Sequence, residues 1–516
     1  MSNIILGLSA LQKIEEGVDI LSNAVKSTLG PKGRNVVIKG LNSPIITNDG
    51  VTIAKSISID DPIVNIGAEL IKQASIHTNQ QAGDGTTTAC VLAQSLLKEG
   101  VKNITAGANP LSMNKGMQYA LKLAVKELEK IAEPIETYTD INKIATISCQ
   151  DSEIGSLISE AYKIVGYNGV ITISDGHKSE TELEVVNGIK LDRGYVSTYF
   201  STDTTKEICE LDNPKVLIYD GRLDNFNTII PYIQECIGTN SPLVIISDDY
   251  TENLLSALLI NKLQAGLQCL PIKAPAYGEL RKNILSDLAI IFDTEIINTY
   301  SDTINTHIQL GQAKKVISTK YDTTFIQDNI NSKVTQRIDD LENKLQECKN
   351  DLEKAHINDR LAKLKGKVAV IKVGGISELE MSERKLRIED ALFACKSAIC
   401  EGIVIGGGSA LLKIKQRISK KMKKLSDYEA LGAKIFLNAL EAPIRQIATN
   451  AEIDGGVIIN KIIKSSNPNY GYDAQNGKFG DLKILGIVDP AKVLRCALQN
   501  AVSVATTILT TNCIAI

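Results

Sequence analysis

The sequence has no tryptophan, and aromatic residues of all kinds make up only 4% of its 516 residues. Its four histidines are well separated, and its ten cysteines include no Cys-x-x-Cys pair. A zinc site or a histidine-based metal site is therefore not expected. The scattered cysteines fit buried thiols in a reducing compartment better than disulfides.

Long hydrophobic runs and an excess of one charge are also missing. The segment Leu254–Ile260 is among the longest apolar runs, far below the ~18 residues of a membrane span. The 57 basic and 60 acidic residues nearly balance, which argues against nucleic acid as the main partner. No basic residue precedes Lys13, so we expect neither a secretory signal nor a transit peptide. The length predicts about three domains.

Helical and α/β patterns follow one another along the chain. Apolar residues recur with a helical period over residues 11–29, 67–80, 90–100 and 114–131. Beyond about Gly166, strand patterns at 169–173, 216–219 and 243–246 alternate with helical segments. From Ser397 onward the chain is helical and rich in glycine and alanine again. This order predicts one domain built from both ends of the chain, with an α/β insertion between them.

The charged stretch 334–365 carries a short heptad repeat. Its apolar positions are Ile338, Leu341, Leu345, Cys348, Leu352 and Ala355. The repeat stops at residues 356–359, which have low helix propensity. We therefore expect a helical hairpin packed on its own domain rather than a dimerising coiled coil.

The most informative segment is Gly83-Asp84-Gly85-Thr86-Thr87-Thr88, which precedes an apolar helical run. Glycines let backbone N–H groups approach an anion, and a helix that begins near Thr86 directs its positive dipole end the same way. Hydroxyls add donors for phosphate oxygens, and a carboxylate can hold the Mg²⁺ of a nucleotide. A plain turn with a helix cap explains the same six residues equally well.

Two further turns support the phosphate interpretation. Residues 28–35 form a second glycine-rich turn after an apolar helical pattern. Asn48-Asp49-Gly50-Val51 reads as a hairpin turn between the β-rich runs 44–47 and 51–54. No Gly-x-x-x-x-Gly-Lys-Ser/Thr pattern occurs, so this is not a Walker A loop.

Taken together and in order, these segments resemble the group I chaperonins, the GroEL-type 60-kDa ring proteins. The resemblance spans nearly the whole chain and rests on TLGPKGRNVV, NDGVTIAK, AGDGTTTA, IEDAL and GGGSAL. It implies a multi-domain α and α/β fold. An equatorial ATP-binding domain would comprise 1–130 and 401–516, an intermediate hinge domain 131–187 and 369–400, and an apical domain 188–368. Candidate hinges are Pro134, Gly188 and Gly402.

The resemblance also implies an ATPase site. Asp390 would be the main catalytic carboxylate and Asp49 its partner in orienting water, although 341 positions separate them. Asp84 would hold Mg²⁺, while Thr28, Asn48 and Thr87 would surround K⁺. The remaining ATP-binding positions would be Leu29, Gly30, Pro31, Gly85, Thr86, Thr88, Gly407, Asp473, Ala474, Gln475 and Asp489. Without the resemblance, each carboxylate reads as an ordinary surface residue.

Some positions depart from the family pattern. Many relatives carry lysine where this chain has Asn48, so a lysine contact to phosphate is lost here. Asp473 stands where asparagine is usual, and Gly366-Lys367 replaces two adjacent glycines. The sequence ends at Ile516 without a Gly/Met-rich segment, which puts tail-dependent folding assistance in doubt.

The middle of the chain resembles the family's polypeptide-binding surface. Residues 253–261 hold more apolar positions than one helical face can bury, and from the residues alone burial is the better interpretation. The resemblance instead predicts a groove that binds non-native polypeptides and the mobile loop of a 10-kDa-type co-chaperonin. Its residues would be Tyr195, Tyr199, Phe200, Ile230, Ile233, Leu255, Leu259 and Ile260. Arg193 and Glu378 would bridge neighbouring subunits, although an unpaired surface role is equally compatible.

The resulting prediction is an ATP-driven folding machine of seven-fold homo-oligomeric rings, usually two stacked, with no nucleic-acid or membrane partner. The rival is a weakly catalytic or non-catalytic structural subunit of a mixed ring, or a holdase. A small-molecule kinase with a coiled coil leaves the IEDAL segment unexplained. We expect a bacterial cytoplasm or, for an organelle-encoded protein, an organelle such as the plastid.

Overall fold

The computed structural model describes residues 4–39, 44–167, 169–176, 178–204, 206–298, 309–327, 332–348, 350–422 and 425–515. Within it the chain divides into two compact units. The terminal unit comprises residues 1–160, 175–181 and 373–516, and the central unit comprises 161–174 and 182–372. The first and last parts of the chain thus share one unit, as the sequence predicted.

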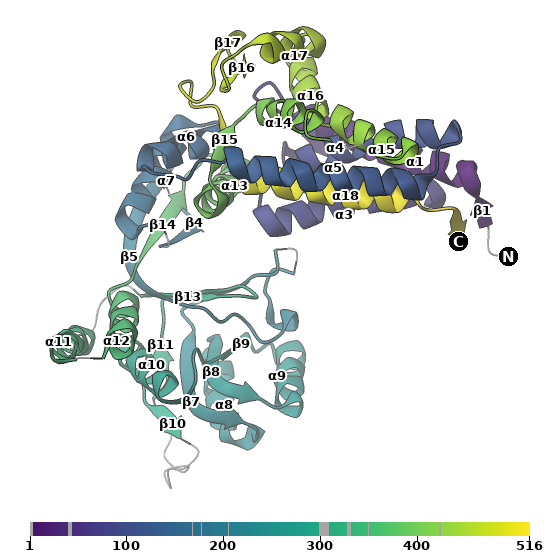
Figure 1. Ribbon diagram of the computed structural model, residues 1–516. Coiled ribbons are helices and arrows are strands. Elements are labelled where there is room, and N and C mark those ends of the chain that lie inside the picture. Colours follow the sequence, from purple (N-terminus) through teal and green to yellow (C-terminus); the bar gives the residue numbers. More distant parts are fainter. Residues whose placement is uncertain are drawn as a thin grey trace. The chain divides into compact units, whose positions relative to one another are not determined.

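The terminal unit is mostly helical (Figure 1). Its longer helices are α1 Gly7–Val25, α3 Pro62–Ala82, α4 Thr86–Thr105, α5 Pro110–Ile131, α6 Tyr138–Cys149, α7 Ser152–Val165, α13 Glu378–Glu401 and α18 Ala491–Leu509. Shorter ones are α2 Gly50–Ser56, α14 Ser409–Ser419, α15 Asp427–Ala439, α16 Ala442–Asn450 and α17 Gly455–Lys464. The four helical periods found in the sequence are all confirmed as helices.

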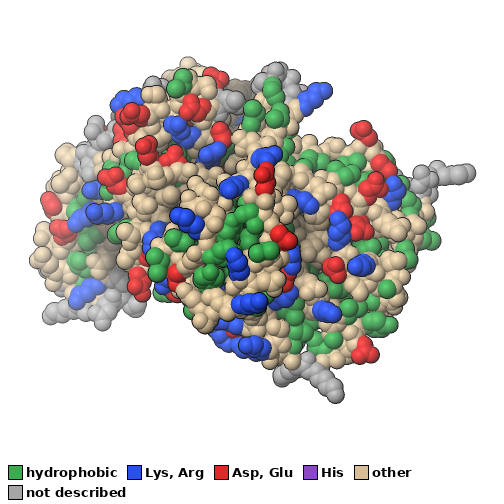
Figure 2. Space-filling view, turned by 90° about the horizontal axis from the view of Figure 1, so that it is seen from above, with side chains coloured by type: hydrophobic (Ala, Val, Ile, Leu, Met, Phe, Trp, Pro, Cys, Tyr) green, Lys and Arg blue, Asp and Glu red, His purple; other side chains and the backbone are tan. Residues whose placement is uncertain are grey.

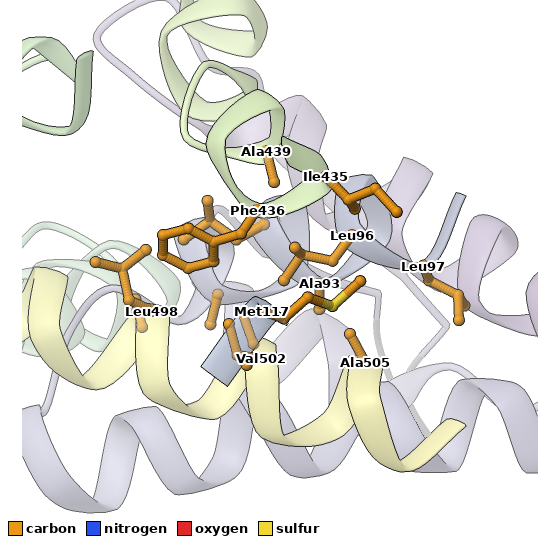
Figure 3. Packing of buried hydrophobic residues seen from close by; sticks show 14 of the residues in the cluster. Ala93, Leu96, Leu97, Met117, Ile435, Phe436, Ala439, Leu498, Val502 and Ala505 are labelled. Atoms are coloured by element: carbon orange, nitrogen blue, oxygen red, sulfur yellow. The ribbon is translucent and has the colours of Figure 1, made fainter. Parts of the chain in front are cut away.

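One apolar core joins the two ends of the chain. Figure 3 shows Leu96 of α4 and Met117 of α5 packed with Phe436 of α15 and Val502 of α18. Small residues such as Ala93 and Ala505 lie between them and allow the helices to approach closely. The core therefore fixes α4, whose N-terminus is important for the site, against helices from both ends of the chain.

The described residues of the terminal unit also form four short antiparallel strand pairs and one isolated β-bridge. Antiparallel pairs join β1 Ile4–Leu6 with β19 Cys513–Ala515, and β2 Val36–Ile38 with β3 Ile45–Thr47. Two more join β15 Ile403–Ile405 with β18 Val488–Pro490, and β16 Tyr470–Asp473 with β17 Lys478–Asp481. An isolated bridge joins Glu133 to Ile403, beside Gly402 at the end of α13.

The central unit contains two sheets. In the first, β10 Ile296–Asn298, β7 Lys215–Leu223, β8 Leu243–Tyr250 and β9 Cys269–Lys273 are parallel neighbours, and β11 Gly311–Gln312 pairs antiparallel with β7. The second has the order β4 Val170–Asp175, β14 Lys367–Val373, β5 Glu182–Leu191, β13 Thr323–Gln327, β12 Lys315–Ser318 and β6 Cys209–Asp212. The α/β prediction for the middle of the chain is confirmed.

Alternation along β7 explains how this unit packs. Val216 and Ile218 face a core shared with α10 Gly278–Phe292 and the second sheet. Leu217 and Tyr219 face the opposite way, toward α8 Ile230–Thr239 and α9 Glu252–Gln264. Because successive side chains of a strand point to opposite faces, one buried strand supports both layers.

The heptad stretch forms a helical hairpin, α11 Ser332–Glu347 and α12 Asp351–Leu364. Leu341, Ile357 and Leu361 form a small core against Ile290 and Ile291 of α10, so the hairpin packs on its own unit as expected. The helical prediction holds through the low-propensity residues 356–359, because α12 continues through them. Buried Ile357 supplies packing that outweighs weak propensity.

One expectation is wrong: residues 51–54 belong to α2 and not to a strand. Asp49 accepts the N–H groups of Val51 and Thr52, at 3.1 and 2.8 Å, and so caps a helix where β-branched residues suggested a hairpin. The three-domain boundaries and the hinges at Pro134, Gly188 and Gly402 remain predictions. Among the described residues, no helix is both long and apolar enough to span a membrane.

Candidate functional site

The terminal unit contains a cavity of about 150 Å³ beside the N-terminus of α4, which we call the α4 cavity. Its walls come from segments far apart in the sequence: the turn after α1, the start of α2, the α3–α4 loop, the end of α6, and α13. The lining residues are Thr28, Leu29, Gly30, Asn48, Asp49, Gly50, Asp84, Gly85, Thr86, Thr87, Thr88, Ser148, Cys149, Gln150, Arg387 and Asp390. The fold thus gathers most of the predicted phosphate-site residues in one place.

The α3–α4 loop presents an uncapped helix start to this cavity. Gly85 is the N-cap residue of α4, has φ 81° and provides no side chain to accept the first-turn N–H groups. By contrast, Asp49, Asp61 and Asn109 cap α2, α3 and α5 with their side chains. The first-turn N–H groups of α4 have no intrahelical acceptor, so they are suited to bind an anion.

Gly50 brings the start of α2 against this loop. A Cβ atom at position 50 would lie 2.5 Å from Thr87 Oγ1 and 2.7 Å from Thr86 Oγ1. Only glycine permits this approach. Asp49 consequently lies beside Asp84 in the cavity wall. Its carboxylate also accepts the Thr52 hydroxyl at 2.6 Å, so Asp49 both caps α2 and lines the cavity.

The acidic side chains in and next to the cavity repel one another. Burial raises the pKa of Asp84; the Gly85 N–H opposes this shift and the charge of Asp49 adds to it. Burial, together with the charge of Asp84, raises the pKa of Asp489 to about 7. Such a group of oxygen ligands fits a hard divalent cation that also takes ligands from a substrate phosphate. Among the described residues, no group of three or more acidic, histidine or cysteine side chains could hold a metal ion by itself, so most ligands would have to come from the phosphate and water.

The predicted monovalent-cation residues also meet. Thr28 Oγ1 and Thr87 Oγ1 are 3.5 Å apart, and Asn48 lines the same wall. The turn that carries Thr28 is held by Asn450, whose Nδ2 donates to the carbonyl oxygens of Lys26 and Leu29 at 2.9 and 2.8 Å. The hydroxyl oxygens of Thr28 and Thr87 and the amide oxygen of Asn48 are the kind of ligand that a potassium ion takes.

Helix α13 brings Asp390 and Arg387 to the cavity. It is attached beside the α3–α4 loop at two points. Ser397 Oγ donates to the carbonyl of Ala82 at 2.9 Å, and the Phe393 side chain lies so close to Gly83 that a Cβ there would be 2.3 Å away. Asp49 and Asp390, 341 positions apart, therefore line one cavity.

The predicted base and ribose residues lie on the neighbouring strands. Asp489 pairs across β15–β18 with Val404, next to Gly406 and Gly407. Asp473 ends β16, where its carboxylate accepts the N–H groups of Gln475 and Asn476 at 3.0 and 3.1 Å. Ala474 is buried in the core beside this turn. None of these residues lines the α4 cavity itself, and neither does Pro31, which is exposed.

The predicted polypeptide-binding residues fall into two groups. Tyr199 and Ile260 are 72% and 52% exposed, while Ile230, Leu255 and Leu259 are half-buried. Tyr195, Phe200 and Ile233, however, lie inside the cores of the central unit. In this structure they cannot touch a partner, because their apolar side chains already pack against the parallel sheet.

Arg193 and Glu378 belong to different units, and the predicted bridge between subunits remains a prediction. Arg193 Nη2 donates to the Tyr277 hydroxyl at 3.4 Å, and Glu378 is exposed in the first turn of α13.

The sequence analysis did not identify three parts of these surfaces. Arg387 lies in a charged helical segment that is typical of a solvated face, and residues 148–150 carry no phosphate-binding pattern. Leu263, which is 76% exposed, lies one turn beyond Ile260 on α9. The only signal in the sequence for Leu263 is one more apolar residue on a helix that has apolar residues on every side.

Comparison with solved structures identifies the architecture. The chaperonin gp146 from the bacteriophage EL 2 (Pseudomonas aeruginosa), crystallised in the presence of ATP-BeFx, is 22% identical in two crystal forms. Crystal form II gives a TM-score of 0.65 over 99% of this chain and 98% of that chain. Crystal form I gives 0.61 over 99% of each. At this identity the similarity shows a shared fold.

The sequence itself matches a family model over residues 21–516, which includes every wall of the α4 cavity. The motifs, the two units and the cavity agree with that match. The chain belongs to the TCP-1/cpn60 chaperonin family.

Proposed function

We propose that this protein is an ATP-dependent chaperonin that hydrolyses ATP in the α4 cavity and binds non-native polypeptides on the central unit. Membership of the family supports the chaperone role, polypeptide binding and a ring-shaped oligomer. One observation carries the ATPase: an uncapped helix start, two threonine hydroxyls and the carboxylates of Asp49, Asp84 and Asp390 surround a single cavity.

Each wall of the cavity has a proposed task. The first-turn N–H groups of α4 and the hydroxyls of Thr87 and Thr88 bind phosphate oxygens. Asp390 orients the attacking water and takes its proton, with Asp49 on the opposite wall keeping that water in line. Leu29 and Gly30 cover the phosphates, while Gly407, Asp473 and Asp489 lie toward the base and ribose.

Two cations complete the proposed site. Asp84 is the ligand that would hold Mg²⁺, and its unfavourable position beside Asp49 and Asp489 fits such a role. When bound, the metal neutralises part of the phosphate charge. Thr28, Thr87 and Asn48 would hold K⁺, in keeping with their shared wall.

The polypeptide site is proposed on a surface that we call the α9 surface: Tyr199, Ile260 and Leu263. Lys262 Nζ donates to the Tyr199 carbonyl at 2.9 Å, which holds Tyr199 beside α9. Contiguous exposed apolar side chains are typical of interaction sites. Because non-native chains share only exposed apolar surface, an apolar site of this kind binds many of them. The mobile loop of a co-chaperonin would use the same surface.

The finer features of the machine are proposals of the same kind. They are a seven-fold double ring, a co-chaperonin lid, contact between neighbouring subunits through Arg193 and Glu378, and a bacterial or organellar compartment. The balanced surface charge, visible as intermixed basic and acidic side chains on the face in Figure 2, suits neither nucleic acid nor an anionic membrane.

The decisive experiment measures ATP turnover of the purified protein and of Asp390→Ala, with and without K⁺, while mass photometry sizes the particle. Glu389→Ala is the matched control, since it lies next to Asp390 on α13 but does not line the cavity. We expect a large ring whose turnover falls about 10²- to 10⁴-fold in Asp390→Ala alone.

Other outcomes separate the alternatives. A large ring with the same negligible turnover in all three proteins would favour a structural subunit or holdase. A small particle would contradict independent ring assembly, and phosphorylation of a small molecule would indicate a kinase.

A further inference from the structure

Arg387 is the one basic side chain among the residues that line the α4 cavity. It lies on α13, one turn before Asp390, and thus on the helix face that borders the proposed γ-phosphate position. Arg387 belongs to none of the phosphate-binding motifs of the sequence.

Its hydrogen bonding is incomplete. Arg387 Nη2 donates to Glu383 Oε1 at 2.6 Å, an i,i+4 pair on the surface of α13. The Nε atom is shielded from solvent, and no described atom accepts a hydrogen bond from it. A buried guanidinium nitrogen without an acceptor is costly, and the cavity next to it is where an acceptor can bind.

The charge balance of the cavity leads to the same residue. Asp49, Asp84 and Asp390 contribute three carboxylates to the lining, and a nucleoside triphosphate adds further negative charge. The Mg²⁺ and K⁺ of the proposed site together offset only part of this sum. Position 48, which also lines the cavity, is the neutral Asn48, and its side chain supplies no positive charge.

We propose that Arg387 binds the terminal phosphate of the bound ATP and stabilises the charge that develops on it during hydrolysis. In that step the bond between the water oxygen and the γ-phosphorus forms, and the bond to the bridging oxygen breaks with its electron pair left on ADP. The water proton goes to Asp390. Arg387 donates hydrogen bonds to the equatorial oxygens, as a planar guanidinium does well.

This role deepens the proposed function and rests on it. ADP lacks the group that Arg387 contacts, so the contact forms only with the triphosphate. Since Arg387 and Asp390 share α13, the same contact ties the position of that helix to the presence of the γ-phosphate.

The test compares binding of ADP with binding of a non-hydrolysable β,γ-imido analogue of ATP, by calorimetry on the assembled protein. In Arg387→Gln we expect affinity for the analogue to fall about 10- to 100-fold, as for loss of a charge-assisted hydrogen bond. ADP affinity should change less than about threefold, and turnover of ATP should fall on the order of 10³-fold, as for other arginines at a γ-phosphate.

Two variants separate binding from a structural role. Glu383→Gln breaks the same i,i+4 pair but leaves the guanidinium, so it should keep the preference for the triphosphate. Arg384→Gln removes a neighbouring arginine that pairs with Glu380 at 2.9 Å and does not line the cavity, and it should also keep that preference. If Glu383→Gln and Arg387→Gln lose affinity alike, the pair is structural and the proposal is wrong.

Rescue is the strictest requirement. Asn48→Lys places a cation elsewhere in the lining of the same cavity and should restore part of the lost affinity in Arg387→Gln. Equal loss for ADP and for the analogue, or no loss at all, would overturn the proposal while leaving the ATPase intact. A parent protein that binds neither nucleotide would instead remove the proposed function, and this inference with it.

Discussion

The α4 cavity and the α9 surface show opposite relations between sequence and site. The cavity is polar and assembled from segments far apart in the sequence, yet nearly all of its predicted phosphate-site residues line it. The α9 surface is apolar. Of the eight residues predicted to bind polypeptides there or nearby, three, Tyr195, Phe200 and Ile233, are buried in a core.

The difference has a physical cause. Several carboxylates gathered in and beside one cavity repel one another, and helix capping by Asp49 accounts for only one of them, so their pattern indicates binding. Apolar residues gain the same free energy from a core as from a partner, and the sequence does not tell the two apart. The predictions below vary charges and apolar groups in both units, from the largest expected effect to the smallest.

The central unit has buried charges that serve stability alone. Asp287 accepts Arg360 Nε at 2.7 Å and Arg337 Nε at 2.9 Å, which ties α10 to α11 and α12. Asp287→Ala leaves a buried arginine unpaired and should lower the free energy of unfolding by about 3–5 kcal/mol. Urea denaturation measures this loss of unfolding free energy, and hydrogen exchange in the native state shows whether it is located in α10–α12.

The control is Asp249→Ala, whose pair with Lys273 is half-exposed and should be worth at most about 1 kcal/mol. ATP affinity should survive in both variants. Loss of ATP affinity in Asp287→Ala, with the terminal unit still folded, would contradict the division between structural and binding charges.

Phe200 and Leu263 test the apolar half of the comparison. Phe200→Ala creates a void in the core against the parallel sheet and should cost about 3–5 kcal/mol of stability. Leu263→Ser changes an exposed residue, so stability should shift by no more than about 0.5 kcal/mol.

Binding of a chemically denatured model polypeptide should respond in the opposite order. Leu263→Ser should weaken it by about 1 kcal/mol or more, the size of an interface contact. Fluorescence titration with the folded variants decides the matter. If Leu263→Ser binds normally, the α9 surface is not the polypeptide site.

The helices of the terminal unit could be predicted from the sequence because their apolar periods are long and regular. Prediction failed where contacts outside the local pattern decided the structure. Residues 51–54 are β-branched in part, yet they form a helix that Asp49 caps and that buries Ile53 and Ala54 in the core. Arg387 was missed for a related reason: a cation on a charged helix face looks solvated until the cavity beneath it is known.

The convergence of Asp49 with Asp390 could be predicted only through the resemblance, because no local pattern links residues in distant segments. Their nearness depends on Gly50 and on the attachment of α13 at Ala82 and Gly83. These are tertiary contacts, and composition and periodicity carry no information about them.

Two glycines with different surroundings sharpen the comparison further. Gly50→Ala pushes a Cβ into Thr86 and Thr87 and should cost about 1–3 kcal/mol, mainly as weaker ATP binding. Gly238→Ala in α8 meets no atom within 4 Å and should be neutral or stabilising by up to about 1 kcal/mol. Thermal unfolding with and without ATP measures both. Equal ATP affinity in the two variants would show that the approach of α2 to α4 is not needed for binding.

The smallest effect concerns a charge pair outside the cavity. Lys421 donates to Glu127 of α5, and Lys130 does so at 3.3 Å. The hydrogen bond from Lys421 is the main cause of the lowered pKa of Glu127, the reverse of the shifts at Asp84 and Asp489. Glu127 therefore has its counter-charge within the fold, whereas burial and a neighbouring carboxylate raise the pKa of Asp84 and of Asp489.

A carboxyl whose pKa is lowered on folding adds stability above its unfolded pKa, and this stability is lost as the pH falls through the folded pKa. Lys421→Met should therefore reduce the free energy of unfolding at pH 7 by at most about 1 kcal/mol, and the difference from the parent should vanish in acid. Lys126→Met, one residue before Glu127 and exposed, should show no such pH dependence. A loss in Lys421→Met that is the same at pH 7 and in acid would mean that packing, and not charge, explains it. The contrast between the lowered pKa of Glu127 and the raised pKa values of Asp84 and Asp489 would then lose its clearest internal reference.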